Sequence, residues 1–404
     1  MPDVYDAIIV GARCAGSPTA MLLARKGYKV LMLDKATFPS DTMSTLIIWP
    51  RGIACLQRWG LLDSLTATGV PPATRKQTFD VGPFALTGSA TPFDGASEGY
   101  APRRTLLDKI LVDAAAAAGA EVREGFSVQE LVRDGDTVTG IRGRSKSGQE
   151  VTETARIVIG ADGLHSAIAK AVGAPAYNER PPQSVAYYTF YSGLPCEGIG
   201  FHLRPNCGFG IFPTNDGLTL IVAGKPVSEF HDFRSDIEGN FLAILAQSPE
   251  VAERVAAAKR EERFVGTADM PNYFRRPYGA GWALVGDAGY HKDSITAQGI
   301  SDAFCEAELL AQAIDNGFAG RAPLEEALAG YEQKRNEFAM PMYEFTVQMA
   351  SMQPPPPEMQ QLFGALLGNQ PDTDRFFGVL AGSVPIPEFF SPENMGRIMS
   401  QAAG

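Results

Sequence analysis

The order of apolar and polar residues at the start of the chain predicts a β-strand, an α-helix and a second β-strand. Residues 5–10 (YDAIIV) form a short apolar run that leads into glycine, as a buried strand does. An Ala- and Leu-rich stretch from Ser17 to Lys26 has helical character and stops at Gly27. Residues 28–33 (YKVLML) have the composition of a second buried strand. This order is typical of a βαβ unit and predicts a parallel sheet.

The remaining chain contains further segments of both kinds. They are a helix at 104–118 ended by Gly119, a β-meander at 121–159, a strand at 283–285, and helices at 301–314 and 324–350. Residues 176–275 are rich in aromatic residues, prolines and short alternating segments, which favours a separate antiparallel sheet. Four prolines at 354–357 interrupt the pattern, and 358–404 form a Phe- and Met-rich tail with short helical pieces. The expected fold class is therefore α/β.

The composition excludes several classes of protein. Of 404 residues, 45% are hydrophobic and 20% charged, which excludes extensive disorder. The formal net charge is −11, so nucleic acid is not an expected partner, because surfaces that bind phosphate backbones are basic. The five cysteines form no CxxC pair, and we expect neither a metal site nor a disulfide framework. No apolar run reaches 18 residues and no signal peptide precedes residue 5, which predicts a cytoplasmic protein without stable membrane insertion.

A glycine motif follows the first predicted strand. It reads Gly11-Ala12-Arg13-Cys14-Ala15-Gly16 and opens the first helix, which is where such a loop binds a pyrophosphate. The helix N-terminus offers free N–H groups and a positive dipole end. Asp34 ends the second strand 18 residues after Gly16, where a carboxylate can accept the hydroxyl groups of a ribose. Together these residues predict a dinucleotide site, although Arg13 replaces the usual middle glycine.

Two further motifs also follow buried strands. Gly160-Ala-Asp162-Gly163 comes directly after the meander, and Gly286-Asp287 comes after the strand at 283–285. From there a loop leads through residues 293–300 into the next helix. Each of these motifs alone is compatible with an ordinary turn, and their order along the chain makes the combination specific.

With these three motifs the chain resembles the FAD-dependent para-hydroxybenzoate hydroxylase fold over roughly residues 1–335. That superfamily includes aromatic hydroxylases, geranylgeranyl reductases and flavin-dependent halogenases. The resemblance implies a Rossmann-like FAD-binding domain, an inserted antiparallel-sheet substrate domain and a C-terminal helical segment. It also implies FAD contacts at Gly11, Ala12, Cys14, Ala15, Gly16, Asp34, Lys35, Arg104, Val128, Asp162, Asp287, Gly299 and Ile300.

The resemblance assigns parts of FAD to particular residues. Gly11 and Gly16 would hold the pyrophosphate, Asp34 the adenosine ribose and Asp287 the ribityl chain. The amides of Gly299 and Ile300 would lie at the N1–C2=O edge of the isoalloxazine ring. A helix N-terminus there stabilises the negative charge of reduced flavin by about 0.3–2 kcal/mol. Many relatives have Asp-Pro in this loop where the present chain has Asp293-Ser294, which leaves the rigidity of the loop open but does not affect the expected fold.

The resemblance also implies a discontinuous domain organisation. Residues 1–75, 103–175 and 276–335 would form the FAD-binding domain, 76–102 and 176–275 the substrate domain, and 336–404 a C-terminal helical cap. The substrate pocket is expected between the second sheet and the flavin, with apolar walls. The chain has no second glycine-rich fingerprint, so NAD(P)H would act as a transient electron donor without a Rossmann domain of its own.

Candidate catalytic residues are few. Trp49 ends the loop 38–49, which relatives place beside the flavin, so it could face either FAD or the substrate. His202 could line the substrate sheet, and His291 lies four residues after Asp287 in the flavin loop. Structural roles for these residues stay open. Oxygen transfer from a flavin C4a-hydroperoxide mainly requires a dry pocket and a substrate at near-attack distance.

The leading hypothesis is an FAD-dependent, NAD(P)H-using monooxygenase that hydroxylates or epoxidises a small apolar compound, with an aromatic one favoured. The first alternative is a geranylgeranyl-reductase-like ene reductase acting on an isoprenoid chain, which the apolar tail could shelter. A halogenase is disfavoured because residues 208–213 (GFGIFP) lack the two tryptophans of the Trp-x-Trp-x-Ile-Pro element, and because Lys76 fits a solvated position. A flavin-binding protein without turnover is the last alternative.

The expected partner is the small-molecule substrate. A two-component system fed by a separate flavin reductase stays open, as does the choice between a monomer and a homodimer.

Overall fold

The computed structural model describes residues 4–402, so the outermost residues of the predicted segments 1–75 and 336–404 lie outside it. A sheet with a parallel centre forms one half of the molecule. β1 lies between β2 and β8, and β5 and β18 extend this parallel core on either side. β6 and β7 continue antiparallel from β8, and β17 pairs antiparallel with β18. The strands are β1 (Tyr5–Val10), β2 (Val30–Asp34), β5 (Glu121–Glu124), β6 (Ser127–Asp134), β7 (Thr137–Arg144), β8 (Glu150–Gly160), β17 (Tyr278–Gly279) and β18 (Trp282–Leu284).

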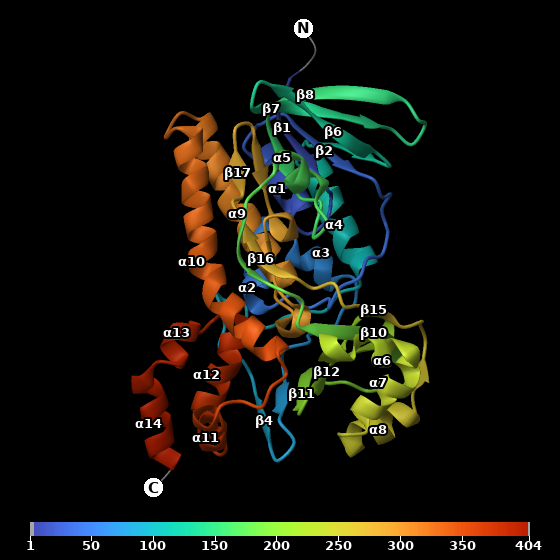
Figure 1. Ribbon diagram of the computed structural model, residues 1–404, viewed down its shortest axis with the longest axis vertical. Helices are drawn as coiled ribbons and strands as arrows, with labels where there is room; N and C mark the ends of the chain where they lie inside the picture. Colours follow the sequence, from blue (N-terminus) through green and yellow to red (C-terminus); the bar gives the residue numbers. More distant parts are fainter. Residues whose placement is uncertain (1–3, 403–404) are drawn as a thin grey trace.

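Both faces of this parallel core are covered, which explains the continuous apolar runs in its strands. Ile8 and Ile9 point to opposite faces of β1 and are both fully buried. The helices α1, α4 and α9 pack together over one face, with α2 against α9 and α10 along its length (Figure 1). The helices around this sheet, including the short α3 and α5, are α1 (Gly16–Arg25), α2 (Pro50–Trp59), α3 (Leu62–Thr66), α4 (Arg104–Ala117), α5 (Ala167–Val172), α9 (Gly299–Phe318) and α10 (Leu324–Ala350).

A second sheet lies below the first along the long axis (Figure 1). Its pairing is antiparallel except between β3 and β11, which run parallel. The strand order is β14-β10-β13-β12-β11-β3-β4, and β15 pairs with β10. The strands are β3 (Gln77–Asp80), β4 (Ala85–Gly88), β10 (Ser184–Ser192), β11 (Ile199–Arg204), β12 (Cys207–Pro213), β13 (Thr219–Pro226), β14 (Lys259–Arg260) and β15 (Val265–Thr267).

Helices cover both faces of the second sheet as well. Tyr187 and Ile221 face one side, where they pack with α6, α7 and α8, whereas Phe190 and Leu220 face the C-terminal helices. The first group is α6 (Phe230–Ser235), α7 (Ile237–Leu245) and α8 (Pro249–Ala256). The second is α11 (Pro357–Leu366), α12 (Gln370–Ala381), α13 (Ile386–Phe389) and α14 (Pro392–Ala402).

A small third sheet connects the two halves. β16 (Asn272–Arg275) pairs with β9 (Ala176–Arg180) on one side and with β19 (Tyr290–His291) on the other. β19 belongs to the loop that follows β18, so this sheet ties that loop to the segments entering and leaving the second sheet. Four short 3₁₀ turns complete the described elements: η1 (Asn215–Gly217), η2 (Val227–Glu229), η3 (Gly286–Ala288) and η4 (Ser294–Thr296).

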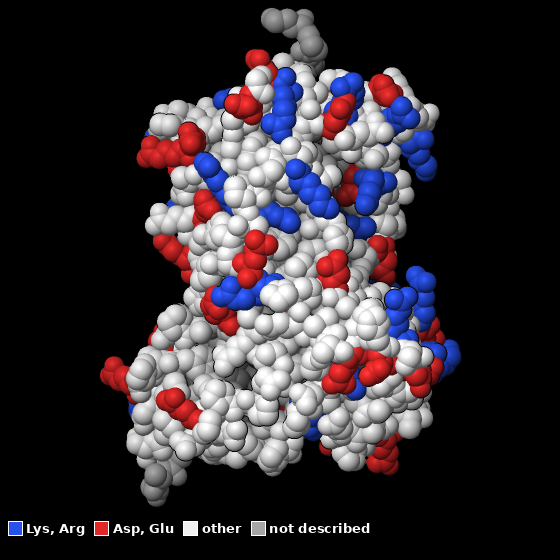
Figure 2. Space-filling model, viewed as in Figure 1, with Lys and Arg blue, Asp and Glu red and all other residues white. Residues whose placement is uncertain are grey.

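The predicted α/β fold class is confirmed, including the parallel βαβ start, the antiparallel sheet and the helical C-terminal segment. The expectation of a purely antiparallel layer at 176–275 was incomplete, because residues 230–256 form three helices that bury apolar side chains on the sheet. The division into three domains stays a prediction. Figure 2 shows charges of both signs mixed over one face, with fewer in the area of the C-terminal helices. Within residues 4–402, no helix is both long and apolar enough to span a bilayer.

Candidate functional site

The predicted motifs meet at one edge of the parallel sheet. Val10 pairs with Leu33 of β2 and with Gly160 of β8, and Leu284 of β18 also pairs with Gly160. Because these strands are parallel, their carboxyl ends lie side by side, and the residues that follow them gather at the same edge. The topology therefore places the glycine loop, Asp34 and both Gly-Asp motifs around one site.

The two outer glycines of the first motif are required by the chain itself. Gly11 has φ +106°, and a Cβ on it would lie 2.3 Å from the carbonyl oxygen of Ala161. A Cβ on Gly16 would lie 1.8 Å from the carbonyl oxygen of Gly11. The loop is thus pressed against the second motif, and the N-terminus of α1 stays available to a phosphate.

The carboxylate of Asp34 is held by two backbone amides. Its Oδ2 accepts the N–H of Ala12 at 2.7 Å and its Oδ1 accepts that of Ala36 at 2.8 Å. Each oxygen keeps a lone pair for a further donor such as a ribose hydroxyl. Lys35 is exposed beside it, and Val128 lies near the start of β6, two residues after Phe126, whose N–H donates to the Asp34 carbonyl.

A buried cluster of charges lies under the glycine loop. Arg104 at the start of α4 donates to both carboxylate oxygens of Asp108, at 2.9 and 3.1 Å. Arg13 also donates to Asp108, and to Ser40 Oγ at 3.0 Å. Its guanidinium group is thus hydrogen-bonded to other residues of the protein. Burial raises the pKa of the Cys14 thiol to about 12, which keeps this predicted contact residue a neutral thiol. Asp108 was not singled out from the sequence, although its i,i+4 spacing from Arg104 was visible.

The two Asp-containing motifs use their carboxylates differently. Asp162 Oδ1 accepts the hydroxyl of Ser166 at 2.5 Å, and its Oδ2 accepts the N–H of Ala167 at 2.7 Å, so it caps α5. Asp287 is exposed. Gly286 has φ +64°, and a Cβ on it would lie 2.8 Å from Ala15 Cβ, which brings Asp287 beside the glycine loop.

The loop that leads into α9 is held firmly by its neighbours. Asp293 caps η4 by accepting the N–H of Ile295 at 3.0 Å, and Ala297 adopts a left-handed conformation with φ +52°. α9 then begins at Gly299, which is exposed, followed by the buried Ile300. The first amides of α9 have no partner within the helix, and the roles of Gly299 and Ile300 at the flavin stay predictions.

Ionisable side chains that the sequence did not reveal lie beneath this loop. Asp302 in the first turn of α9 is paired with both Lys292 and Arg51, and Lys292 also donates to Tyr290 Oη at 2.7 Å. Glu306, one turn further, accepts the N–H of Gly286 at 3.2 Å. Burial raises the pKa of Glu306 to about 7. These residues come from different segments of the chain, so the cluster is recognisable only in the folded structure.

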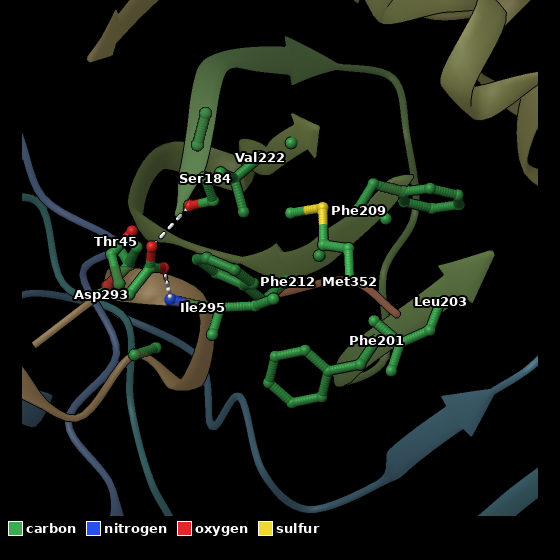
Figure 3. A pocket seen from close by; sticks show the side chains of 16 residues that line it. Thr45, Ser184, Phe201, Leu203, Phe209, Phe212, Val222, Asp293, Ile295 and Met352 are labelled. Carbon is green, nitrogen blue, oxygen red and sulfur yellow. Dashed lines mark hydrogen bonds between the residues drawn. The ribbon is translucent and has the colours of Figure 1, made fainter. Parts of the chain in front are cut away.

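An apolar pocket opens between the α9 loop and the second sheet (Figure 3). Its cavity volume is about 60 Å³, within a recess of about 600 Å³ that includes open solvent. Most of the wall is apolar, and it includes the rings of Phe201 and Phe212, whereas the ring of Phe209 points to the other face of the sheet. The other lining residues are Thr45, Ser184, Ala186, Leu203, Gly208, Gly210, Val222, Gly224, Asp293, Ser294, Ile295, Ala297 and Met352. Polar side chains gather at one end, where Figure 3 shows Ser184 and Thr45 beside Asp293.

The three predicted catalytic residues lie outside the set that lines this pocket. Trp49 is fully buried and donates from Nε1 to the carbonyl oxygen of Thr296 at 3.2 Å, so it supports the loop. His202 pairs with Asp80 at 2.9 Å and stacks on Phe209 with ring centroids 4.2 Å apart, and burial lowers its pKa. His291 contacts the carbonyl oxygen of Pro271 through Nδ1. Their catalytic roles stay predictions.

The sheet edge fits a dinucleotide carrying a pyrophosphate. It combines a glycine loop without side chains in the way, an oriented carboxylate at Asp34, an exposed residue at Asp287 and the exposed Gly299 at the start of α9. No group of three or more His, Cys, Asp or Glu residues that could hold a metal ion occurs within the described range 4–402.

The sequence is similar to those of known flavoproteins. A family model described as FAD binding domain matches residues 4–346. Digeranylgeranylglycerophospholipid reductase 2 of Methanococcoides burtonii is 27% identical over 359 residues, which cover 81% of this chain and 79% of that protein.

Two solved structures share the fold at low identity. The myxobacterial chondrochloren halogenase CndH superposes with a TM-score of 0.80 at 23% identity, covering 99% of this chain and 97% of the other. PqsL of Pseudomonas aeruginosa, described as a probable FAD-dependent monooxygenase, has a TM-score of 0.73 at 22% identity, covering 93% and 99%.

Proposed function

The chain belongs to the FAD binding domain family, and from this premise we propose that it is a monooxygenase acting on a small, apolar compound. As a member of that family it is an FAD-dependent oxidoreductase, and the proposal concerns its reaction. The observation that carries the proposal is the apolar pocket beside the start of α9, whose walls include the phenylalanine rings of Phe201 and Phe212. A site of this kind can hold an aromatic compound and keep water away from the reacting atoms.

The residues at the sheet edge would hold FAD. The glycine loop and α1 would take the pyrophosphate, Asp34 the ribose of adenosine, and Asp287 the ribityl chain. When bound, FAD supplies a redox-active isoalloxazine ring, and in monooxygenases of this kind also the activation of oxygen. The protein itself would contribute the amides at the start of α9, the loop that Trp49 supports through the Thr296 carbonyl, and the apolar walls of the pocket.

The reductase alternative is favoured by sequence relatives, since several named digeranylgeranylglycerophospholipid reductases are 25–29% identical to the chain. The C-terminal tail gives this alternative no support. The large side chains of Leu362, Phe363, Phe376, Phe377 and Phe389 are buried against the protein itself, with Phe79 touching Phe363 and Phe376. Sheltering a long isoprenoid chain there would require these helices to separate.

The halogenase alternative lacks its expected lysine. Lys76 pairs with Glu197 at 3.1 Å, and its side chain is 55% exposed, so it does not reach the pocket. This geometry matches the solvated position expected from the sequence.

Anaerobic mixing of the FAD-loaded protein with NADPH, and separately with NADH, tests the proposal. We expect one donor to bleach the visible flavin absorbance, and a phenolic or other aromatic substrate to accelerate the bleaching. Admitting oxygen should then yield a product heavier by one oxygen atom. A saturated product from a polyprenyl lipid under anaerobic conditions would instead establish the reductase. If neither nicotinamide bleaches the flavin, we propose that a separate flavin reductase supplies the electrons.

A further inference from the structure

One hydrogen bond inside the pocket joins the α9 loop to the second sheet. Ser184 at the start of β10 donates from Oγ to Oδ2 of Asp293 at 2.6 Å (Figure 3). Both residues are only 2% exposed, and both line the pocket. The other carboxylate oxygen of Asp293 accepts the N–H of Ile295, and its own N–H donates to Asn272 Oδ1 at 2.7 Å. The carboxyl group is thus fixed at the polar end of an otherwise apolar cavity.

The surroundings of Asp293 contain little compensating charge. β10 and β16 contribute the neutral Ser184 and Asn272, and the adjacent Lys292 turns its ammonium group to Asp302 and Tyr290. The hydrogen bonds from Ser184 and from the Ile295 amide oppose the effect of burial, and His291, two residues earlier, opposes it less. Burial dominates and raises the pKa of Asp293 above its ordinary value.

The lining of the pocket has a simple charge pattern. Asp293 is the one ionisable side chain among the residues of the described chain that line it, and no Lys, Arg or His is among them. A buried carboxylate from a ligand would therefore lose its hydration without gaining a cation, and would meet Asp293 as a like charge. A ligand hydroxyl group, in contrast, is neutral and can donate to a remaining lone pair of the Asp293 carboxyl group or of Ser184 Oγ, whose own proton is bonded to Asp293.

We propose that Asp293 and Ser184 determine the substrate class of this pocket: they bind the hydroxyl group of an uncharged apolar compound and exclude compounds that carry a carboxylate. The inference rests on the proposed function in that it takes the pocket as the substrate site. Asp293 acts here as a binding and selecting residue, and the sequence pattern alone gave it no such role.

Equilibrium binding to the FAD-loaded protein, without nicotinamide, tests this directly. The probes are 2-naphthol, 2-naphthoate and naphthalene, which share one ring system. We expect 2-naphthol to bind at least about tenfold more tightly than 2-naphthoate. The gap should widen as the pH rises through the raised pKa of Asp293, because ionisation of Asp293 adds repulsion to the ionised probe alone.

Two variants separate the roles of the pair. Asp293→Asn should bind both naphthol and naphthoate with a ratio that no longer changes with pH. Ser184→Ala should weaken 2-naphthol about fivefold, the value of one ordinary hydrogen bond, and leave naphthalene unchanged. Asp216→Asn is the matched control, because Asp216 is exposed in a turn with φ +60°, which asparagine tolerates.

The proposal is overturned if 2-naphthoate binds as tightly as 2-naphthol to the unmodified protein, or if neither probe binds. It is also overturned if Ser184→Ala weakens 2-naphthol and naphthalene equally. Should Asp293→Asn fail to fold, the unmodified protein and Ser184→Ala still decide. Because turnover is not measured, a protein that selects 2-naphthol but is never reduced by NADPH or NADH would retain this inference and contradict the monooxygenase.

Discussion

The edge of the parallel sheet and the pocket on the antiparallel sheet are built by different means. At the edge, backbone atoms form the site. The carbonyl oxygen of Ala161 lies against Gly11 and that of Gly11 lies against Gly16, and two backbone amides orient the Asp34 carboxylate. In the pocket, side chains form the site, and they come from β10 to β13, the α9 loop, loop 38–49 and Met352, two residues after α10. A backbone site depends on a few short motifs, whereas a side-chain site depends on the whole packing around it.

This difference indicates how each region can change. Substitution at the glycines is sterically impossible, so the edge should tolerate little variation. The pocket walls are ordinary apolar residues of moderate size, and exchange among them costs little when the volume is kept. One edge can thus serve many substrates, which is consistent with reductases, halogenases and monooxygenases appearing among the proteins that the chain resembles.

The largest effect on the site at the sheet edge is expected from Gly16→Val. Its Cβ would lie 1.8 Å from the Gly11 carbonyl oxygen, and this oxygen belongs to backbone that is packed on Ala161. We expect at least about a hundredfold loss of FAD affinity, or no folded protein. The flavin-to-protein absorbance ratio measures it. Gly364→Ala in α11 is the control, since a Cβ there meets nothing within 4 Å. Full flavin content in Gly16→Val would contradict the packing argument.

Phe376→Ala probes the side-chain region at a distance from the pocket. Phe376 is 1% exposed and its ring lies against Phe79 of β3 at 5.2 Å and against Phe363 at 5.5 Å. Removing it should lower the free energy of unfolding by about 3–5 kcal/mol. Urea denaturation measures this, with the partly exposed Phe390→Ala as the milder comparison. An equal loss of unfolding free energy in the two variants would contradict the central position of Phe376 in the core of this region.

Glu306→Gln concerns the junction of the two regions and is expected to alter the pH dependence of stability. The folded pKa of Glu306 is about 7, above its ordinary 4.5, so the folded state keeps the proton longer than the unfolded state. Its contribution is present below about pH 4.5 and is lost as pH rises through about 7, a difference of about 3 kcal/mol. Glutamine cannot ionise, so the variant should lack this slope. Unfolding curves at several pH values measure it, and an unchanged slope would assign the pH dependence elsewhere.

Asp34→Ala tests the oriented carboxylate with the smallest expected effect. The change removes the acceptor for the Ala12 and Ala36 amides and for a ribose hydroxyl. We expect FAD to bind about 10- to 100-fold more weakly, measured by quenching of flavin fluorescence. Lys35→Ala is the neighbouring control, because Lys35 is exposed. An equal loss of FAD affinity in both variants would contradict a specific role for the Asp34 carboxylate.

The edge could be predicted from sequence because its motifs are local. Each one directly follows a buried strand, and the parallel order brings the strand ends together without further information. The pocket could not be predicted in the same way. Asp293 and Ser184 are 109 residues apart, and nothing in either local sequence reveals the hydrogen bond between them. His202 and His291 drew attention for their chemistry, but stacking on Phe209 and a contact with the Pro271 carbonyl occupy them.

The central claim is that the flavin at the sheet edge and the apolar pocket form one site. The most direct measurement is the difference absorbance spectrum of the FAD-loaded protein on adding 2-naphthol, in the unmodified chain and in Leu203→Trp. Leu203 lines the pocket and is partly exposed, so a larger side chain there should fill the cavity while FAD stays bound. The account predicts a perturbed flavin spectrum that is lost in the variant. Binding of 2-naphthol without any change in the flavin spectrum, or an equal change in Leu203→Trp, would contradict it.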